Sequence, residues 1–204
     1  KPVRMEAYQN EHVILDGTRI ITGKWEKHDG HIYKTNIDIN IEQLFVGNQM
    51  MIEARWPNMS FEQRFDRDRW ARADKGSTHG LVLSDAIAES DIDWTGAMAC
   101  LNVAHQWWTW NRPITGHEAG SNRLTYDADL VGLCNYDPEF WKTNEVKPYA
   151  KRVWNDDSFY LFGILEALDS ETEWHYEAQT KTLYFFAPGG VDPSTLEIRY
   201  KSRD

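Results

Sequence analysis

One short stretch of the chain combines three tryptophans with polar neighbours. Its members are His105, Trp107, Trp108, Trp110, Asn111 and Arg112. Sugars present apolar C–H faces that stack on aromatic rings, and their hydroxyls need hydrogen-bonding groups of the kinds found here. In a strand, Trp108 and Trp110 would share one face and Trp107 would point to the other, so one face is expected to pack inward. The stretch therefore indicates either a glycan contact or packing against the core or a parent domain.

A second candidate lies at the end of a predicted strand, where Pro57 follows Arg55 and Trp56 and stops the strand. The structural interpretation is that Arg55 pairs with a buried carboxylate such as Glu53 or Asp169. A role in a substrate groove is the other interpretation, and it depends on the family resemblance described below.

Metal and acid–base patterns are weak, so no catalytic residue, metal site or cofactor is predicted. His28 and His31 flank a turn, but two imidazoles without further ligands do not make a metal site. Calcium could bind aspartate pairs in loops, although solvated carboxylates are the commoner case. These pairs are Asp91 with Asp93 and Asp156 with Asp157. A glycosidase needs two carboxylates about 5–10 Å apart, but among 32 acidic residues such pairs arise by chance.

Short strands are predicted to position these residues. Residues 173–177 alternate in polarity, and residues 183–186 are apolar on both faces, which predicts a hairpin whose second strand is central in a sheet. The sequence Pro188-Gly189-Gly190 stops that strand. Gly47-Asn48, between two apolar runs, indicates a further hairpin, and Asp16-Gly17 and Asp29-Gly30 indicate tight turns. Strands are also expected at residues 3–8, 97–104 and 196–201.

The remaining segments are less regular. Residues 59–92 are predicted to be a solvated loop or short helix, and Ser158 could cap a short helix at 159–168. No internal repeat of solenoid period is present. The fold class is therefore all-β: one antiparallel sandwich or barrel-like domain spanning residues 1–204, with long loops and one short helix.

Composition restricts the function classes. The 204 residues can form one sizeable core, and the net charge of −10 argues against a nucleic-acid partner. No apolar run is long enough to span a membrane, and no signal peptide is present, so no membrane partner is expected. Cys100 and Cys134 could form one bridge or remain free, so they do not indicate a compartment.

Several motifs together resemble a segment of large bacterial right-handed parallel β-helix proteins, which include α-1,3-galactosidases and some β-xylosidases. The matching motifs, in order, are Val13-Ile14-Leu15-Asp16-Gly17-Thr18, Trp25, Ile32-Tyr33-Lys34, Gln43-Leu44-Phe45-Val46, Ala54-Arg55-Trp56-Pro57-Asn58, Leu168-Asp169, Glu173-Trp174, Leu183-Tyr184-Phe185 and Pro188-Gly189-Gly190. The resemblance covers roughly residues 3–58 and 160–203. It implies an antiparallel domain inserted early in the β-helix, with residues 1–20 and 195–204 as strands close to that helix.

The resemblance implies that the catalytic residues lie on a β-helix that this chain lacks. The expected function is a non-catalytic accessory domain that binds a glycan or shapes the active-site groove, with Arg55 and Trp56 facing the groove. Its partners would be a polysaccharide or oligosaccharide and the parent β-helix, outside the cell or in the periplasm. The alternatives are a structural or oligomerising module and, third, a glycoside hydrolase or lyase in its own right.

Overall fold

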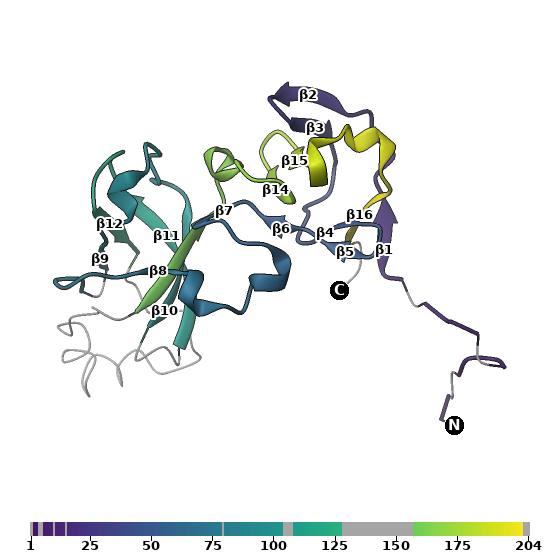
Figure 1. The fold of residues 1–204 in the computed structure, drawn as a ribbon, viewed down its shortest axis with the longest axis horizontal. Coiled ribbons are helices and arrows are strands. Elements are labelled where there is room, and N and C mark those ends of the chain that lie inside the picture. The colour runs from purple at the N-terminus through teal and green to yellow at the C-terminus, as the bar shows by residue number, and fades with distance from the viewer. Residues whose placement is uncertain are drawn as a thin grey trace.

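A computed structural model describes residues 2–3, 6–9, 11–14, 16–78, 80–103, 108–127 and 157–201, with the backbone alone at 103 and 108. Three β-sheets account for the regular structure of these residues, and their only helical elements are short 3-10 turns. Figure 1 shows the largest sheet at one end of the molecule and the other two sheets at the opposite end. The all-β prediction is confirmed.

The largest sheet has the strand order β7-β13-β10-β11-β12-β9, and β8 also pairs with β13. Its strands are β7 (Arg55–Trp56), β8 (Ala71–Arg72), β9 (Leu81–Leu83), β10 (Met98–Val103), β11 (Trp108–Gly116), β12 (Arg123–Tyr126) and β13 (Ser158–Phe162). Every pairing in this sheet is antiparallel.

The second sheet contains the predicted hairpin and has the order β2-β3-β15-β14-β6. Its strands are β2 (Glu26–Asp29), β3 (Ile32–Asn36), β6 (Ile52–Glu53), β14 (Glu173–Glu177) and β15 (Thr182–Phe186). β15 is central, as predicted, and pairs with β3 on one side and β14 on the other. The β14–β6 contact is the one parallel pairing among the described strands.

The third sheet joins the two ends of the chain, in the order β1-β16-β4-β5. Its strands are β1 (Thr18–Ile20), β4 (Leu44–Val46), β5 (Gln49–Met50) and β16 (Ile198–Lys201). The predicted Gly47-Asn48 hairpin connects β4 to β5, and Gly47 has the positive φ of 55° that such a tight turn requires. β1 lies antiparallel to β16, so residues 18–20 and 199–201 are neighbours in space.

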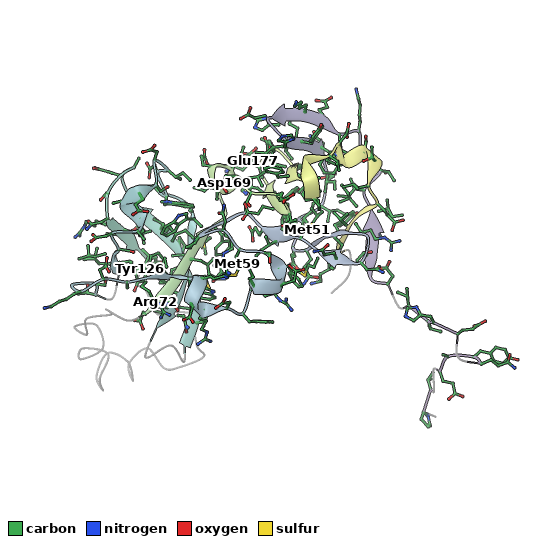
Figure 2. The ribbon with its side chains drawn as sticks, in the orientation of Figure 1. Met51, Met59, Arg72, Tyr126, Asp169 and Glu177 are labelled. Carbon is green, nitrogen blue, oxygen red and sulfur yellow. The ribbon has the colours of Figure 1, made fainter. Side chains whose placement is uncertain are left out.

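Two hydrophobic clusters hold the sheets together. The first contains Trp94, Trp110 and Phe159 and lies in the largest sheet. The second contains Leu183 and Phe185, both fully buried, and lies between the other two sheets. Tyr184, between them in sequence, packs on the first cluster, because successive side chains of a strand point to opposite faces. Figure 2 shows Tyr126 toward one end of the molecule and Met51 toward the other.

Three predictions about local structure are wrong. Residues 158–162 form strand β13 rather than the start of a helix, because they pair with β10 on one side and with β7 and β8 on the other. Only the 3-10 turn η4 (Leu165–Ala167) follows. Among residues 2–3 and 6–9, the described part of the predicted strand at 3–8, no strand forms.

The third error concerns residues 59–92, which are not simply a solvated loop. They contain β8 and β9 and three 3-10 turns, η1 (Phe61–Gln63), η2 (Arg67–Arg69) and η3 (Ile87–Glu89). Ala71, Val82 and Ile87 are buried in the first cluster. Two more 3-10 turns, η5 (Pro188–Gly190) and η6 (Pro193–Thr195), precede β16.

Candidate functional site

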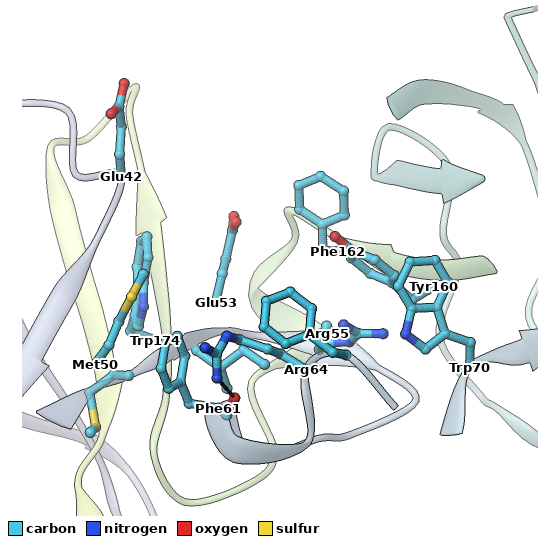
Figure 3. Close-up of a pocket in the computed structure, with 13 residues that line it drawn as sticks. Glu42, Met50, Glu53, Arg55, Phe61, Arg64, Trp70, Tyr160, Phe162 and Trp174 are labelled. Carbon is cyan, nitrogen blue, oxygen red and sulfur yellow. Dashed lines mark hydrogen bonds between the residues drawn. The ribbon is translucent and has the colours of Figure 1, made fainter. Parts of the chain in front are cut away.

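A cleft of about 300 Å³ lies beside the short strands that connect the largest sheet to the rest of the chain. One wall comes from β5, β6 and Trp174 of β14, and the other from Tyr160 and Phe162 of β13. The segment carrying Phe61 and Trp70 completes it. Figure 3 shows Glu53 between these walls, with Arg55 and Arg64 nearby.

Strand alternation places two charged residues in the cleft. Glu53 ends β6 and Arg55 begins β7, so their side chains lie on the same face of the chain and both line the cleft. Ala54, between them, points the other way and is fully buried in the first cluster. Pairing of β6 with β14 and of β7 with β13 fixes the backbone on both sides of Ala54.

Arg55 is buried, with a 5% exposed fraction, and lies against aromatic rings. Its guanidinium carbon is 3.5 Å from the Tyr160 ring centre and 5.7 Å from that of Trp70. Nε donates a hydrogen bond to the Pro57 carbonyl at 3.2 Å, whereas Nη2 is buried without a hydrogen-bond partner. Burial lowers the pKa of Arg55, although the guanidinium stays protonated near neutral pH.

The predicted ion pairs of Arg55 do not form: neither Glu53 nor Asp169 forms an ion pair with it, and Asp169 instead accepts from the Asn58 Nδ2 at 2.6 Å. Three nearby groups oppose the lowering of the Arg55 pKa by burial: Tyr160 and Cys100 have the larger effects, and Glu173 is the carboxylate among them.

Glu53 is half-buried among apolar side chains, and no described residue forms a hydrogen bond or ion pair with its carboxylate. Burial raises its pKa to about 7, because removal from water penalises the charged form. A carboxylate so placed accepts hydrogen bonds strongly from any donor that enters the cleft.

The opposite lip of the cleft is a cation–aromatic sandwich. The Arg64 guanidinium carbon lies 3.8 Å from the Phe61 ring centre and 4.4 Å from that of Phe65. Arg64 Nη1 donates to the Phe61 carbonyl at 2.7 Å, which fixes the guanidinium. Phe65 is 81% exposed, although it lines the cleft. An exposed phenyl ring at the mouth of an aromatic-lined cleft favours the binding of a ligand with an apolar face.

Three hydrogen-bond donors on residues that line the cleft have no acceptor. Arg55 Nη2, Trp70 Nε1 and Trp174 Nε1 are buried, and none has an acceptor. Buried donors are nearly always paired in folded proteins, so three on one cleft are unusual. The arrangement could take a ligand with several acceptors and at least one apolar face.

Glu173, on β14 behind the cleft, is almost completely buried. Burial, and then the negative charge of Asp169, raises its pKa to about 8. Backbone N–H groups of Arg55, Asp169 and Ser170 face this carboxylate and oppose the shift, without forming fully aligned hydrogen bonds. Glu173 therefore packs behind the residues that line the cleft and does not line it itself.

The predicted aromatic stretch is only partly described by the structure. Trp110 is 7% exposed and packs in the first cluster, with the Arg112 guanidinium 4.9 Å from its ring centre. Asn111 is exposed and Arg112 half-buried. His105, Trp107 and the side chain of Trp108 lie outside the described residues. The glycan contact predicted for this stretch stays a prediction.

The two residues that were predicted to face the groove have side chains on opposite sides of the strand. Arg55 lines the cleft, whereas Trp56 turns to the opposite face, where its ring centre is 6.3 Å from those of Trp94 and Phe159. Four residues of the cleft were not predicted from the sequence to belong to a site: Phe61, Arg64, Phe65 and Trp70. The interleaving of arginines with aromatic residues in 61–72 was the available signal, although its ionic pattern favoured a solvated segment.

Metal and membrane features add little. Among the described residues, no group of three or more His, Cys, Asp or Glu could hold a metal ion. Nor does that part of the chain contain a helix long and apolar enough to cross a bilayer. Cys100 is buried, and Cys134 lies outside the described ranges.

Comparisons with known proteins support the fold alone. No family model matches the sequence, and no curated protein matches it. One solved structure, titled "Glycoside hydrolase", superposes on 95% of this chain with a TM-score of 0.62 and 18% sequence identity. The match spans 32% of that protein's chain, so this fold occurs there as one part of a longer polypeptide. The chain thus has the fold of a domain found within a larger glycoside hydrolase.

Proposed function

We propose that this chain is a non-catalytic domain that binds a glycan, or shapes the groove that holds one, within a larger polysaccharide-degrading enzyme. The observation that carries the proposal is the aromatic cleft, in which an exposed Phe65 and the unpartnered Arg55 Nη2 lie together. The fold similarity to part of a glycoside hydrolase chain adds support.

The chemistry of the cleft suits a sugar. A pyranose ring has an apolar C–H face that could stack on Phe65 or Phe61, and a rim of hydroxyls that could reach the spare donors. Binding sites for small polar ligands generally combine apolar walls with a few well-placed polar groups. The cleft has both properties.

The wider setting is part of the same proposal. The partners would be a polysaccharide or oligosaccharide and a parent parallel β-helix that carries the catalytic carboxylates. The protein would act outside the cell or in the periplasm, where polysaccharides are met. The adjacency of β1 and β16 suits a domain inserted into such a helix.

Affinity gel electrophoresis on xylan, galactan, mannan and dextran tests the proposal. Wild-type protein should be retarded by at least one of these, with a dissociation constant on the order of micromolar to millimolar for a shallow site. Phe65→Ala should weaken that retention without changing the free energy of unfolding by more than about 0.5 kcal/mol, because the side chain is exposed.

Tyr8→Ala is the matched control: Tyr8 is also an exposed aromatic, at 68%, but does not line the cleft. It should leave retention unchanged. No retardation by any of the four polysaccharides would favour the alternative of a structural or oligomerising module. Release of reducing sugar that Glu53→Gln abolishes would contradict the non-catalytic assignment.

A further inference from the structure

The polar groups in the cleft are left incompletely paired. Glu53, Arg55 and Arg64 all line it, and none forms an ion pair with another. Arg64 is held between two phenyl rings and donates to a backbone carbonyl. Glu53 therefore remains as a free acceptor, and Arg55 Nη2 remains as a free donor.

A hydroxyl group satisfies both requirements, because it donates one hydrogen bond and accepts others. One sugar unit carries several hydroxyls, so one could donate to Glu53 while another accepts from Arg55 Nη2 or Trp70 Nε1. No net charge on the ligand is needed for this, since the cleft presents charges of both signs.

Charged sugars fit less well. A carboxylate or sulfate would bring a second negative charge close to Glu53, with Glu42 also lining the cleft. The two arginines offer limited compensation, because Arg55 is only 5% exposed and Arg64 already donates to the Phe61 carbonyl. Like charges in a partly dehydrated site repel more strongly than in water.

We infer that the cleft selects uncharged sugar units over uronic acid or sulfated ones, with Glu53 accepting from ligand hydroxyls and Arg55 donating to them. This inference rests on the proposed glycan-binding function and names the ligand class of the same site. Since burial raises the pKa of Glu53 to about 7, its carboxylate is mostly ionised at pH 8, where discrimination should be clearest.

The test uses xylan, galactan, mannan and dextran, each with its chemically sulfated derivative, in affinity gels at pH 8 and constant ionic strength. The neutral polysaccharide that is retained should bind about tenfold or more tightly than its sulfated partner. Equal or tighter binding of a sulfated derivative would overturn the inference and leave the glycan-binding proposal standing. Failure of all eight to bind would overturn both.

Glu53→Gln tests the residue itself. Loss of the charge should weaken binding of the neutral polysaccharide about fivefold, because a charge-assisted hydrogen bond becomes a neutral one. It should also bring the ratio between neutral and sulfated affinities close to one. Glu26→Gln, an exposed glutamate on β2 outside the cleft, is the control and should change neither quantity. A variant ratio equal to that of the wild type would refute the role of Glu53.

A second substitution covers the case in which Glu53→Gln fails to fold. Glu53→Asp keeps the charge and shortens the side chain, so it should weaken neutral binding while preserving the preference for the neutral partner. Loss of that preference in a folded Asp variant would contradict the inference.

Discussion

Glu173→Gln should stabilise the protein, and the gain should grow as the pH rises from 5 to 8. Glu173 is 1% exposed, and burial raises its pKa from 4.5 to about 8. Between these values the unfolded chain releases its proton while the folded protein retains it, so the unfolded state binds fewer protons. The unfolding free energy therefore falls as the pH rises through this window, and the wild type is most stable below pH 4.5 as far as this group is concerned.

The magnitude follows from the size of the pKa shift. Each pKa unit is worth about 1.4 kcal/mol, and pH 7 lies about 2.5 units above the pKa of the unfolded state, which gives an upper limit of about 3.5 kcal/mol. Local rearrangement and water penetration reduce this limit, so we expect the Gln variant to gain about 1–3 kcal/mol between pH 5 and 7. Glutamine has nearly the same shape and no charge, so packing should change little.

Urea denaturation followed by tryptophan fluorescence at pH 5, 6, 7 and 8 gives the unfolding free energy of both proteins. The relevant quantity is the difference in unfolding free energy between the variant and the wild type at each pH. The contributions of all other titrating groups are the same in both proteins and cancel in this difference. Glu26→Gln, at an exposed site on β2, should show a flat difference. A Glu173→Gln difference that stays constant or shrinks with rising pH would refute the burial argument.

Three further substitutions test the core and the turns by the same denaturation assay. Phe185→Ala should cost about 3–5 kcal/mol because the side chain is fully buried, and a loss within about 0.5 kcal/mol would show that the hairpin is peripheral. Trp110→Ala should cost about as much and leave polysaccharide retention unchanged; weaker retention at unchanged stability would instead place this indole in a glycan site. Gly190→Ala should cost at least about 1–2 kcal/mol, because φ is 64° and a Cβ would meet His31 Nδ1 at 2.7 Å. Gly17→Ala, with no atom within 4 Å of the added carbon, is its control; equal losses at the two glycines would contradict the steric argument.

Local signals predicted much of the sheet structure. Residues 183–186 are apolar at every position, and such a run requires a strand with both faces covered. In β15, Tyr184 packs on the first cluster and Leu183 and Phe185 pack on the second. Gly47-Asn48 predicted its hairpin for a reason equally local, the ease with which these residues adopt positive φ. The error at 159–168 has a tertiary cause, because β13 is a strand through its pairing with neighbours remote in sequence.

The cleft could be predicted only in part. Alternation along residues 53–56 is visible in the sequence, but Arg55 and Trp56 were both expected to face the groove, and only Arg55 lines the cleft. The packing of Ala54 and Trp56 on the first cluster decides which side of this segment points into the cleft. The exposure of Phe65 and the stacking of Arg64 depend on the path of residues 61–70, which has no strong period.

Side-chain periodicity and the backbone preferences of proline and glycine were enough to predict the all-β class, the central hairpin and the end of its second strand at Pro188. Two features became visible only in the folded chain: one cleft is lined by Glu53, Arg55, Phe65 and Tyr160, and Trp110 is a core residue. Burial and the lack of a hydrogen-bond partner depend on packing between segments more than one hundred residues apart in the chain, such as those of Arg55 and Tyr160. No local sequence pattern predicts which of the two faces of a strand such packing will cover.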